Sequence, residues 1–195
     1  MRKNKVTRPL IIIPARLGSK RLKHKNVLPV KGLPMFVYVA KNMEKSSFSP
    51  HIFISSESGK VQKICKFYNL NFLKRPKKLS LDNVEKQLVI VHAVKKIEKK
   101  YKFKPEVVIS LQANSPEIKT KHLDEAIKIF KKSFKKKKNK ELISVGKDNL
   151  QNAAFRIMNY SAVFQKSLST NIIVYKKDYR DIHNNNDYLK VLKKI

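Results

Sequence analysis

The sequence predicts an α/β fold, more specifically a Rossmann-like three-layer αβα arrangement around a mostly parallel central sheet. Two observations predict it. Short, strongly apolar segments such as residues 10–15 and 106–111 have the composition of buried parallel strands. Between such segments, apolar residues recur at helical spacing. Strands that alternate with amphipathic helices are typical of a parallel sheet that is covered on both faces.

The size and composition of the chain fit one domain. Its 195 residues are 42% hydrophobic, which is enough to fill a sizeable core. Neither an internal repeat nor a linker-like segment divides the sequence. We therefore predict a single domain over residues 1–195.

The first 100 residues contain three expected strands and three expected helices. A Gly-Leu-Pro turn precedes the first helix, and Ser58 is a suitable N-cap for the second. The expected strands are residues 10–15, 51–55 and 71–74, and the expected helices are residues 35–44, 58–68 and 83–100, the last with an inward stripe of Leu88, Ile90, Val91, Val94 and Ile97.

The second half of the chain continues the alternation. The expected strands are residues 106–111, 141–145, 153–158 and 171–175, and the expected helices are residues 120–134 and 185–195, the latter with Leu189 and Leu192 inward. The lysine-rich residues 135–140 are expected to form a solvated helix end or loop, because like charges at this density repel one another. Residues 159–170 show no clear period.

The net charge of +31 raises the question of nucleic-acid binding, which dense positive charge drives by counterion release. The excess is nearly all lysine and is spread along the chain, and lysine reads base edges less well than arginine does. Basic residues are not interleaved with aromatic residues as they are in a stacking platform. We therefore expect contacts with nucleic acids to be only non-specific.

One cysteine excludes an internal disulfide framework and suits a reducing compartment. Cys65 lies with Val61, Ile64 and Tyr68 on one face of an expected helix, so we predict that it is buried. Apolar runs are too short for a membrane span, and residues 10–13 are too short for the apolar core of a signal peptide. These features predict a cytoplasmic protein that does not associate with membranes.

The most informative segment, residues 10–34, combines an apolar strand with a loop rich in cations. A buried strand that ends in a Gly/Ser loop with cations is how α/β proteins hold the phosphates of a nucleotide. The segment lacks both the Gly-Lys-Ser/Thr end of a Walker loop and a GxGxxG motif. Arg16 and Arg21 can bind phosphate oxygens with two N–H groups each, and Lys25 offers a point charge.

The order Pro-Ala-Arg-x-Gly-Ser-Lys-Arg at residues 14–21, followed by Lys25-Asn26, resembles the acylneuraminate (sialic-acid-type) cytidylyltransferases. The 3-deoxy-manno-octulosonate cytidylyltransferases are their nearest relatives. The resemblance implies a nucleotide-diphospho-sugar transferase-like fold and transfer of CMP from CTP to an acidic sugar, with Mg²⁺ or Mn²⁺. It implies catalytic roles for Arg16, Arg21 and Lys25. The nucleotide-binding residues that it implies are Ala15, Arg16, Gly18, Ser19, Arg21, Lys25, Asn26 and Arg75.

Two later segments extend the resemblance. Residues 74–82 are similar to an Arg-Pro-x-x-Leu-Ala-x-Asp loop, which implies that Arg75 faces the nucleotide, while Asp82 is expected to cap the following helix. Residues 111–116, Leu-Gln-Ala-Asn-Ser-Pro, are similar to Leu-Gln-Pro-Thr-Ser-Pro and imply that Gln112 and Asn114 bind the substrate. The octulosonate branch has a metal-binding Asp at the position of Asn114, so the neutral side chain argues against that branch.

The end of the chain matches less closely. Residues 171–175 are similar to Asn-Gly-Ala-Ile-Tyr and imply a substrate-binding Asn171, although Ile172 replaces the glycine. Residues 181–189 are similar to an Asp-Ile-Asp-Thr-x-x-Asp-Leu ending whose two leading aspartates hold Mg²⁺. These fall on Asp181 and His183, and the imidazole should weaken Mg²⁺ binding or favour a softer ion. The alternative for His183 is an ordinary surface residue.

Between Arg156 and Asn171 the chain is shorter than the sialic-acid branch would have it. We expect residues 153–175 to be a reduced sugar-side and dimerisation segment. The expected partners are CTP, an acidic sugar and a second copy of the chain as a homodimer.

The leading hypothesis is a nucleotidyltransferase that makes a CMP-activated sialic-acid-like nonulosonate. A transferase for another sugar is a related alternative. A catalytically degenerate homologue would bind CTP without turnover. A basic nucleic-acid-binding protein on the same scaffold would bind RNA even at physiological salt.

Overall fold

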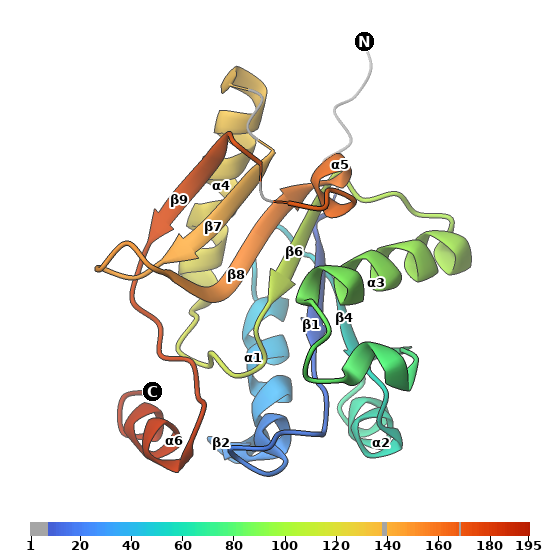
Figure 1. Ribbon diagram of the computed structural model, residues 1–195, viewed down its shortest axis with the longest axis vertical. Helices are drawn as coiled ribbons and strands as arrows, with labels where there is room; N and C mark the ends of the chain where they lie inside the picture. The colour runs from blue at the N-terminus through green and yellow to red at the C-terminus, as the bar shows by residue number, and fades with distance from the viewer. Residues whose placement is uncertain (1–7, 138–139, 168) are drawn as a thin grey trace.

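The fold is seen in a computed structural model, which describes residues 8–137, 140–167 and 169–195 (Figure 1). Its strands are β1 (Leu10–Pro14), β2 (Pro29–Val30), β3 (Leu33–Pro34), β4 (His51–Ser56), β5 (Asn71–Lys74), β6 (Val107–Leu111), β7 (Glu141–Val145), β8 (Gln151–Asn159) and β9 (Ile172–Lys176). Its helices are α1 (Met35–Glu44), α2 (Gly59–Phe67), α3 (Lys86–Tyr101), α4 (Thr120–Lys137), α5 (Tyr160–Val163) and α6 (Asn185–Leu192), with 3₁₀ turns η1 (Lys25–Val27) and η2 (Lys77–Ser80).

One sheet of seven strands forms the middle layer, in the order β5-β4-β1-β6-β8-β7-β9. Only β8 among these described strands runs against its neighbours, β6 and β7, and the other pairs are parallel. The prediction of an α/β fold with a mostly parallel sheet is therefore confirmed. Strands β2 and β3 form a separate small hairpin next to α1.

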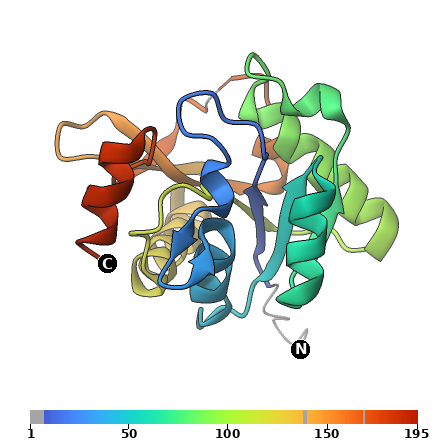
Figure 2. The same cartoon turned by 90° about the horizontal axis from the view of Figure 1, so that it is seen from below.

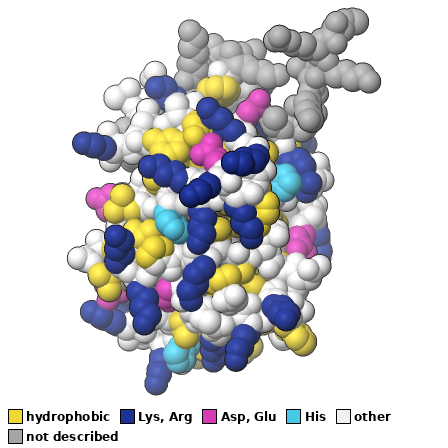
Figure 3. All heavy atoms as spheres, turned by 90° about the vertical axis from the view of Figure 1, so that its right-hand side faces the viewer, with side chains coloured by type: hydrophobic (Ala, Val, Ile, Leu, Met, Phe, Trp, Pro, Cys, Tyr) yellow, Lys and Arg dark blue, Asp and Glu magenta, His cyan; other side chains and the backbone are white. Residues whose placement is uncertain are grey.

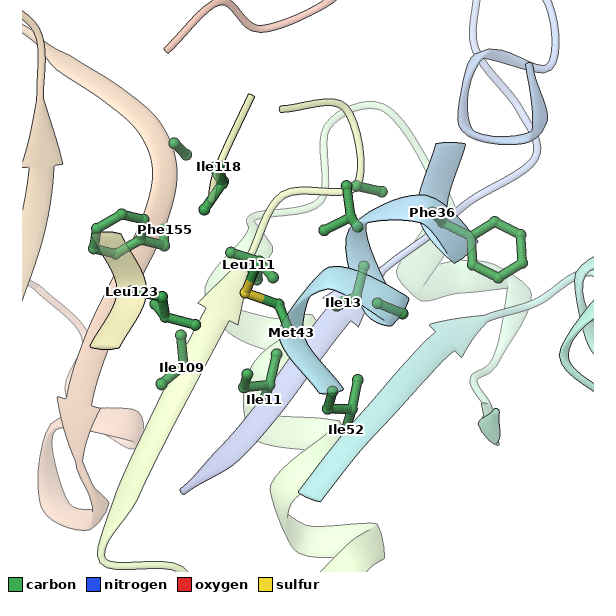
Figure 4. Packing of buried hydrophobic residues seen from close by; sticks show 14 of the residues in the cluster. Ile11, Ile13, Phe36, Met43, Ile52, Ile109, Leu111, Ile118, Leu123 and Phe155 are labelled. Carbon is green, nitrogen blue, oxygen red and sulfur yellow. The ribbon is translucent and has the colours of Figure 1, made fainter. Parts of the chain in front are cut away.

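Helices cover both faces of the sheet (Figure 2). Alternate side chains of β1 point to opposite faces, so Ile11 and Ile13 pack with α1, α2 and α4, whereas Leu10 and Ile12 pack with α3. All four side chains are fully buried. This explains why β1 is continuously apolar rather than alternating. Figure 4 shows the first of these two cores, where Met43 of α1 lies among isoleucines from neighbouring strands.

Most expected elements form, and the differences lie at helix ends. Ser58 caps α2 as predicted, because its hydroxyl accepts hydrogen bonds from the N–H groups of Lys60 and Val61. Helix α3 begins at Lys86 rather than at residue 83, so the predicted capping role of Asp82 is wrong. Leu88 was expected to point inward, but it is 51% exposed, and the buried face of α3 includes Val89 and Ala93 instead.

Helix α6 ends at Leu192, three residues before the expected end. Its first turn carries a capping box in which Asn184 and Asp187 each bind the other's backbone N–H. The expectation that Leu189 points inward is wrong, since it is 49% exposed. The fully buried residue is Val191, which packs with Ile182 and with Met35 of α1.

Lysine and arginine side chains are distributed over the whole face shown in Figure 3, with acidic and apolar side chains between them. Within the described residues, no helix is long and apolar enough to cross a membrane. The expectation for residues 135–140 falls partly on residues 138 and 139, which lie outside the described residues.

Cys65 is fully buried, as the sequence predicts, in the core to which residues of α1 also belong. Burial raises the pKa of its thiol to about 12. We expect the native protein to resist a thiol reagent such as DTNB at pH 8, because the reactive thiolate is scarce and shielded. The same reagent should label one thiol per chain in denaturant. Rapid labelling of the native protein would contradict this packing.

Candidate active site

A cavity of about 290 Å³ opens at the carboxyl ends of β1 and β6. The chain leaves β1 toward β4 on one side and later enters β6 on the other side, so the cavity lies where the strand order reverses. Ligands of open α/β sheets bind at this position. The predicted site residues that line it are Arg16, Gly18, Ser19, Arg21, Lys25, Asn26, Arg75, Gln112, Asn114, Asp181 and His183.

Two predicted site residues lie elsewhere. Ala15 is fully buried directly after β1. Its N–H donates to the carbonyl of Ser55, which fixes the start of the loop to β4. Asn171 is exposed and directly precedes β9. Because β9 runs parallel to β7, and β7 runs in the direction of β1, its amino end lies at the opposite edge of the sheet. The structure does not bring Asn171 to this cavity.

The loop after β1 is held in place by two hydrogen bonds to its backbone. Asn26 is buried, and its amide nitrogen donates to the carbonyl of Arg16 at 2.9 Å. The N–H of Leu17 donates to the Glu57 carboxylate at 3.0 Å. Both bonds hold the backbone next to Arg16 in place.

Glu57 is the centre of a small polar network beneath this loop. One carboxylate oxygen accepts from Leu17, and the other accepts from Arg75 at 3.1 Å and from the Ser80 hydroxyl at 2.8 Å. Arg75 is only 3% exposed and also donates to Ser80 at 2.8 Å. Its guanidinium lines the cavity but is bound by this network.

Burial alone would raise the pKa of Glu57. Hydrogen bonds from backbone N–H groups and Ser80, together with the charge of Arg75, outweigh burial and hold this pKa below its usual value. The sequence interpretation did not include Glu57. A signal was present, because the residue directly follows the strand β4 at the edge where ligands bind.

Asp82 belongs to the loop's charge pattern rather than to a helix cap. Its carboxylate pairs with Arg16 at 2.6 Å and with Lys20 at 3.0 Å. These two hydrogen-bonded cations lower the pKa of Asp82. Arg16 is thereby held against the segment that follows η2, on one side of the cavity.

The opposite side of the cavity is formed by the segment before α6. Asn114, at the end of β6, exchanges hydrogen bonds with the backbone of Ile182: its carbonyl accepts at 2.9 Å and its side-chain amide donates at 3.2 Å. The Ser115 hydroxyl donates to the Asp181 carboxylate. Asp181 and His183 are thus fixed to β6, although they are more than 65 residues away along the chain.

The Lys25 ammonium, which lines the cavity, is partly buried. Burial lowers the pKa of Lys25, the charge of Asp181 opposes this effect, and the nearby Arg21 and Arg16 add to it. Burial likewise raises the pKa of Asp181. The positive charges of Lys25, Arg21 and Arg16 repel one another. A bound anion would offset this repulsion, so the cavity favours an anionic ligand.

The sequence pattern of one protein family, described as Cytidylyltransferase, matches residues 10–188. The chain belongs to the cytidylyltransferase family. The resemblance that the loop motif indicated is therefore confirmed. The N-acylneuraminate cytidylyltransferase of Escherichia coli O18:K1:H7 is 32% identical over 124 residues, which make up 64% of this chain and 28% of that protein. The chain spans only 24–46% of the length of the first curated relatives that it matches.

Two solved structures share the fold. CMP:2-keto-3-deoxy-manno-octonic acid synthetase complexed with CTP has a TM-score of 0.76 and 13% identity, over 96% of this chain and 98% of that one. Rv0371c of Mycobacterium tuberculosis H37Rv in complex with manganese has a TM-score of 0.67 and 9% identity, over 97% and 100% of the two chains. At these identities the likeness establishes the fold.

Two carboxylates of the described residues line the cavity. That of Asp82 is paired with Arg16 and Lys20, so Asp181 is the carboxylate that remains for a divalent cation. Among the described residues, no three His, Cys, Asp or Glu side chains are grouped closely enough to hold a metal ion by themselves. His183 Nδ1 lies 3.3 Å from an Arg21 nitrogen. Because arginine only donates hydrogen bonds, Nδ1 is the acceptor in this contact and the ring hydrogen is on Nε2. Neither ring nitrogen therefore has a free lone pair for a metal ion. One carboxylate with substrate phosphates fits the manner in which Mg²⁺ is usually bound.

The Glu57 network makes a prediction about stability. Glu57→Gln should lower the free energy of unfolding by about 2 kcal/mol at pH 7, because hydrogen bonds to a charged group are weakened. The pKa of Glu57 is depressed in the folded state, so its contribution is complete above its unfolded pKa of about 4.3 and is lost as the pH falls through the folded value. Urea unfolding at pH 7 and at progressively lower pH measures both effects.

Glu44→Gln is the matched control. Glu44 pairs with Lys41 on the exposed surface of α1, and such a pair contributes roughly 0–1 kcal/mol. Equal effects of the two substitutions would contradict the role assigned to Glu57.

Proposed function

We propose that this cytidylyltransferase transfers CMP from CTP to an acidic sugar of the sialic-acid-like class and releases pyrophosphate. The observation that carries the proposal is the convergence of Arg16, Arg21 and Lys25 on one cavity at the strand ends, opposite Asp181. The family membership supports the nucleotide, and the names of the N-acylneuraminate relative and the octonic acid synthetase support an acidic acceptor.

In the proposed reaction, a hydroxyl oxygen of the sugar forms a bond to the α-phosphorus of CTP. The bond between this phosphorus and the oxygen that bridges to the β-phosphate breaks, pyrophosphate leaves with that electron pair, and the hydroxyl proton passes to water. Negative charge accumulates on the phosphate oxygens along this path. Pre-positioned cations stabilise such charge without reorganising, which is the main source of catalysis in phosphoryl transfer.

The chain's residues divide this work. Arg16, Arg21 and Lys25 bind triphosphate oxygens, and Ser19 and the backbone around Gly18 add hydrogen-bond donors. Gln112, at the end of β6, offers both an amide donor and an acceptor to the acceptor sugar. Asn26, Arg75 and Asn114 position these groups, since their polar atoms are hydrogen-bonded within the protein.

We propose Mg²⁺ or Mn²⁺ as the metal, held by Asp181 together with the triphosphate. A divalent cation there would neutralise phosphate charge and polarise the phosphorus for attack. The role of His183 as a ligand stays a prediction, and it requires the contact with Arg21 to open. Homodimerisation also stays a prediction, which sedimentation velocity can test.

The first experiment on this function is a thermal-shift screen with CTP, UTP, ATP and GTP. At 100 times its dissociation constant, a ligand that binds only the folded state stabilises it by about 2.7 kcal/mol. For a chain of this size, the melting temperature should rise by roughly 5–10 °C with CTP and much less with the other three. Equal shifts with all four nucleotides would show that the cavity binds phosphate groups without selecting the cytosine base, which would contradict the proposed specificity for CTP.

The second experiment measures turnover. Arg21→Ala should lower kcat/KM for CTP-dependent pyrophosphate release with N-acetylneuraminate by about 10²–10³, because it removes a donor aimed at the developing charge. Lys23→Ala, an exposed cation on the same loop, is the control and should change kcat/KM less than about twofold.

Absence of turnover by the wild-type protein with a panel of nonulosonates and octulosonates would end the enzymatic claim. If CTP still bound, the catalytically degenerate homologue would replace it.

A further inference from the structure

A second cavity of about 280 Å³ adjoins the nucleotide cavity on the face of the sheet that α3 covers. It is lined by Lys86, Gln87, Ile90, Ser110, Gln151, Phe155 and Arg156. These residues come from the first turns of α3, from β6 and from β8. Of the described residues, only Lys86 lines both cavities, so it marks their junction.

The polar groups of the second cavity are held firmly. Arg156 donates to the fully buried Glu141 carboxylate at 2.9 Å through Nε and pairs with it at 2.7 Å through Nη2. Its Nη1 donates to the Gln87 side-chain oxygen at 2.9 Å. The Gln87 amide in turn donates to the carbonyl of Val163. A guanidinium has five N–H groups, so two donors of Arg156 are left beyond these bonds.

The Lys86 ammonium is the cation at the junction. Arg156 is compensated by Glu141, whereas the charges that act on the Lys86 ammonium are Asp181 in the first cavity and Arg156 in the second. The described lining of the second cavity contains no carboxylate. An occupant that places a negative group at the junction and hydroxyl or amide groups deeper inside would match this arrangement.

A 2-keto acid sugar has this distribution of groups. Its carboxylate is bonded to the same carbon that carries the hydroxyl attacking the α-phosphorus. The group that binds the carboxylate must therefore lie beside the nucleotide cavity rather than deep in the second one. Lys86 is the side chain at that position.

We propose that the second cavity holds the ring of the acceptor sugar and that Lys86 binds its carboxylate, an inference that rests on the proposed function. Arg156, Gln151 and Ser110 then face the ring substituents. Lys86 thereby selects acidic over neutral sugars and turns the attacking hydroxyl toward the nucleotide. Neither cavity alone could do this, because the carboxylate and the hydroxyl must straddle their border.

The test measures equilibrium binding, so that it does not depend on turnover. N-acetylneuraminate and its methyl ester are titrated calorimetrically into the protein saturated with α,β-methylene-CTP, which cannot release pyrophosphate. The wild type should bind the acid at least about tenfold more tightly than the ester, because only the acid offers a charge-assisted hydrogen bond. Lys86→Met should bind the acid as weakly as the ester.

Three controls separate this role from a structural one. Lys86→Arg keeps the cation and should recover most of the preference for the acid. Lys99→Met, an exposed lysine on the last turn of the same helix, should leave the preference unchanged. Lys86→Met should weaken the binding of the CTP analogue much less than it weakens the binding of the acid.

The inference is overturned if Lys86→Met keeps the wild-type preference for the acid, or if it loses the CTP analogue as strongly as the sugar. It is equally overturned if the wild type binds the analogue but neither sugar. Binding of the acid without turnover, in contrast, would uphold the role of Lys86 and refute the proposed reaction.

Discussion

The candidate active site depends on a single half-buried carboxylate, that of Glu57. The segment after β1 carries five cations within the ten residues 16–25, and their mutual repulsion favours open conformations. Glu57 opposes this by accepting the N–H of Leu17, and it can do so only because Arg75 and Ser80 compensate its own burial. Loop geometry and the loop's electrostatics are therefore set by the same charge.

The arrangement of charges around the cavity favours an anionic occupant. On one side, Asp82 compensates part of the positive charge by pairing with Arg16. On the other side, Asp181 compensates part of it by its interaction with Lys25. The remainder is left for the ligand. A site that is built before the ligand arrives loses little energy to rearrangement, and such preorganisation is what phosphoryl transfer requires.

The parallel sheet supplies the geometry by which distant segments meet. The carboxyl ends of β1, β4, β5 and β6 lie at one edge, so the loops that follow them converge there. The last segment of the chain joins them through Asn114 and Ser115, which bind Ile182 and Asp181. The antiparallel β8 brings Arg156 next to Ser110 and so builds a second cavity beside the first.

The sequence by itself determined the fold class, most elements, the burial of Cys65 and the position of the cation-rich loop after β1. Apolar periodicity and a run of cations after a strand are local patterns, and such patterns can be recognised from the sequence alone. The tertiary structure decided what depends on contacts between distant segments. It paired Asp82 with Arg16 instead of with a helix end, and it brought Glu57 and Lys86 into the site. It also left Asn171 at the far edge of the sheet. Strand order and helix start determine these contacts, and both follow from packing of the whole chain rather than from any short stretch of it.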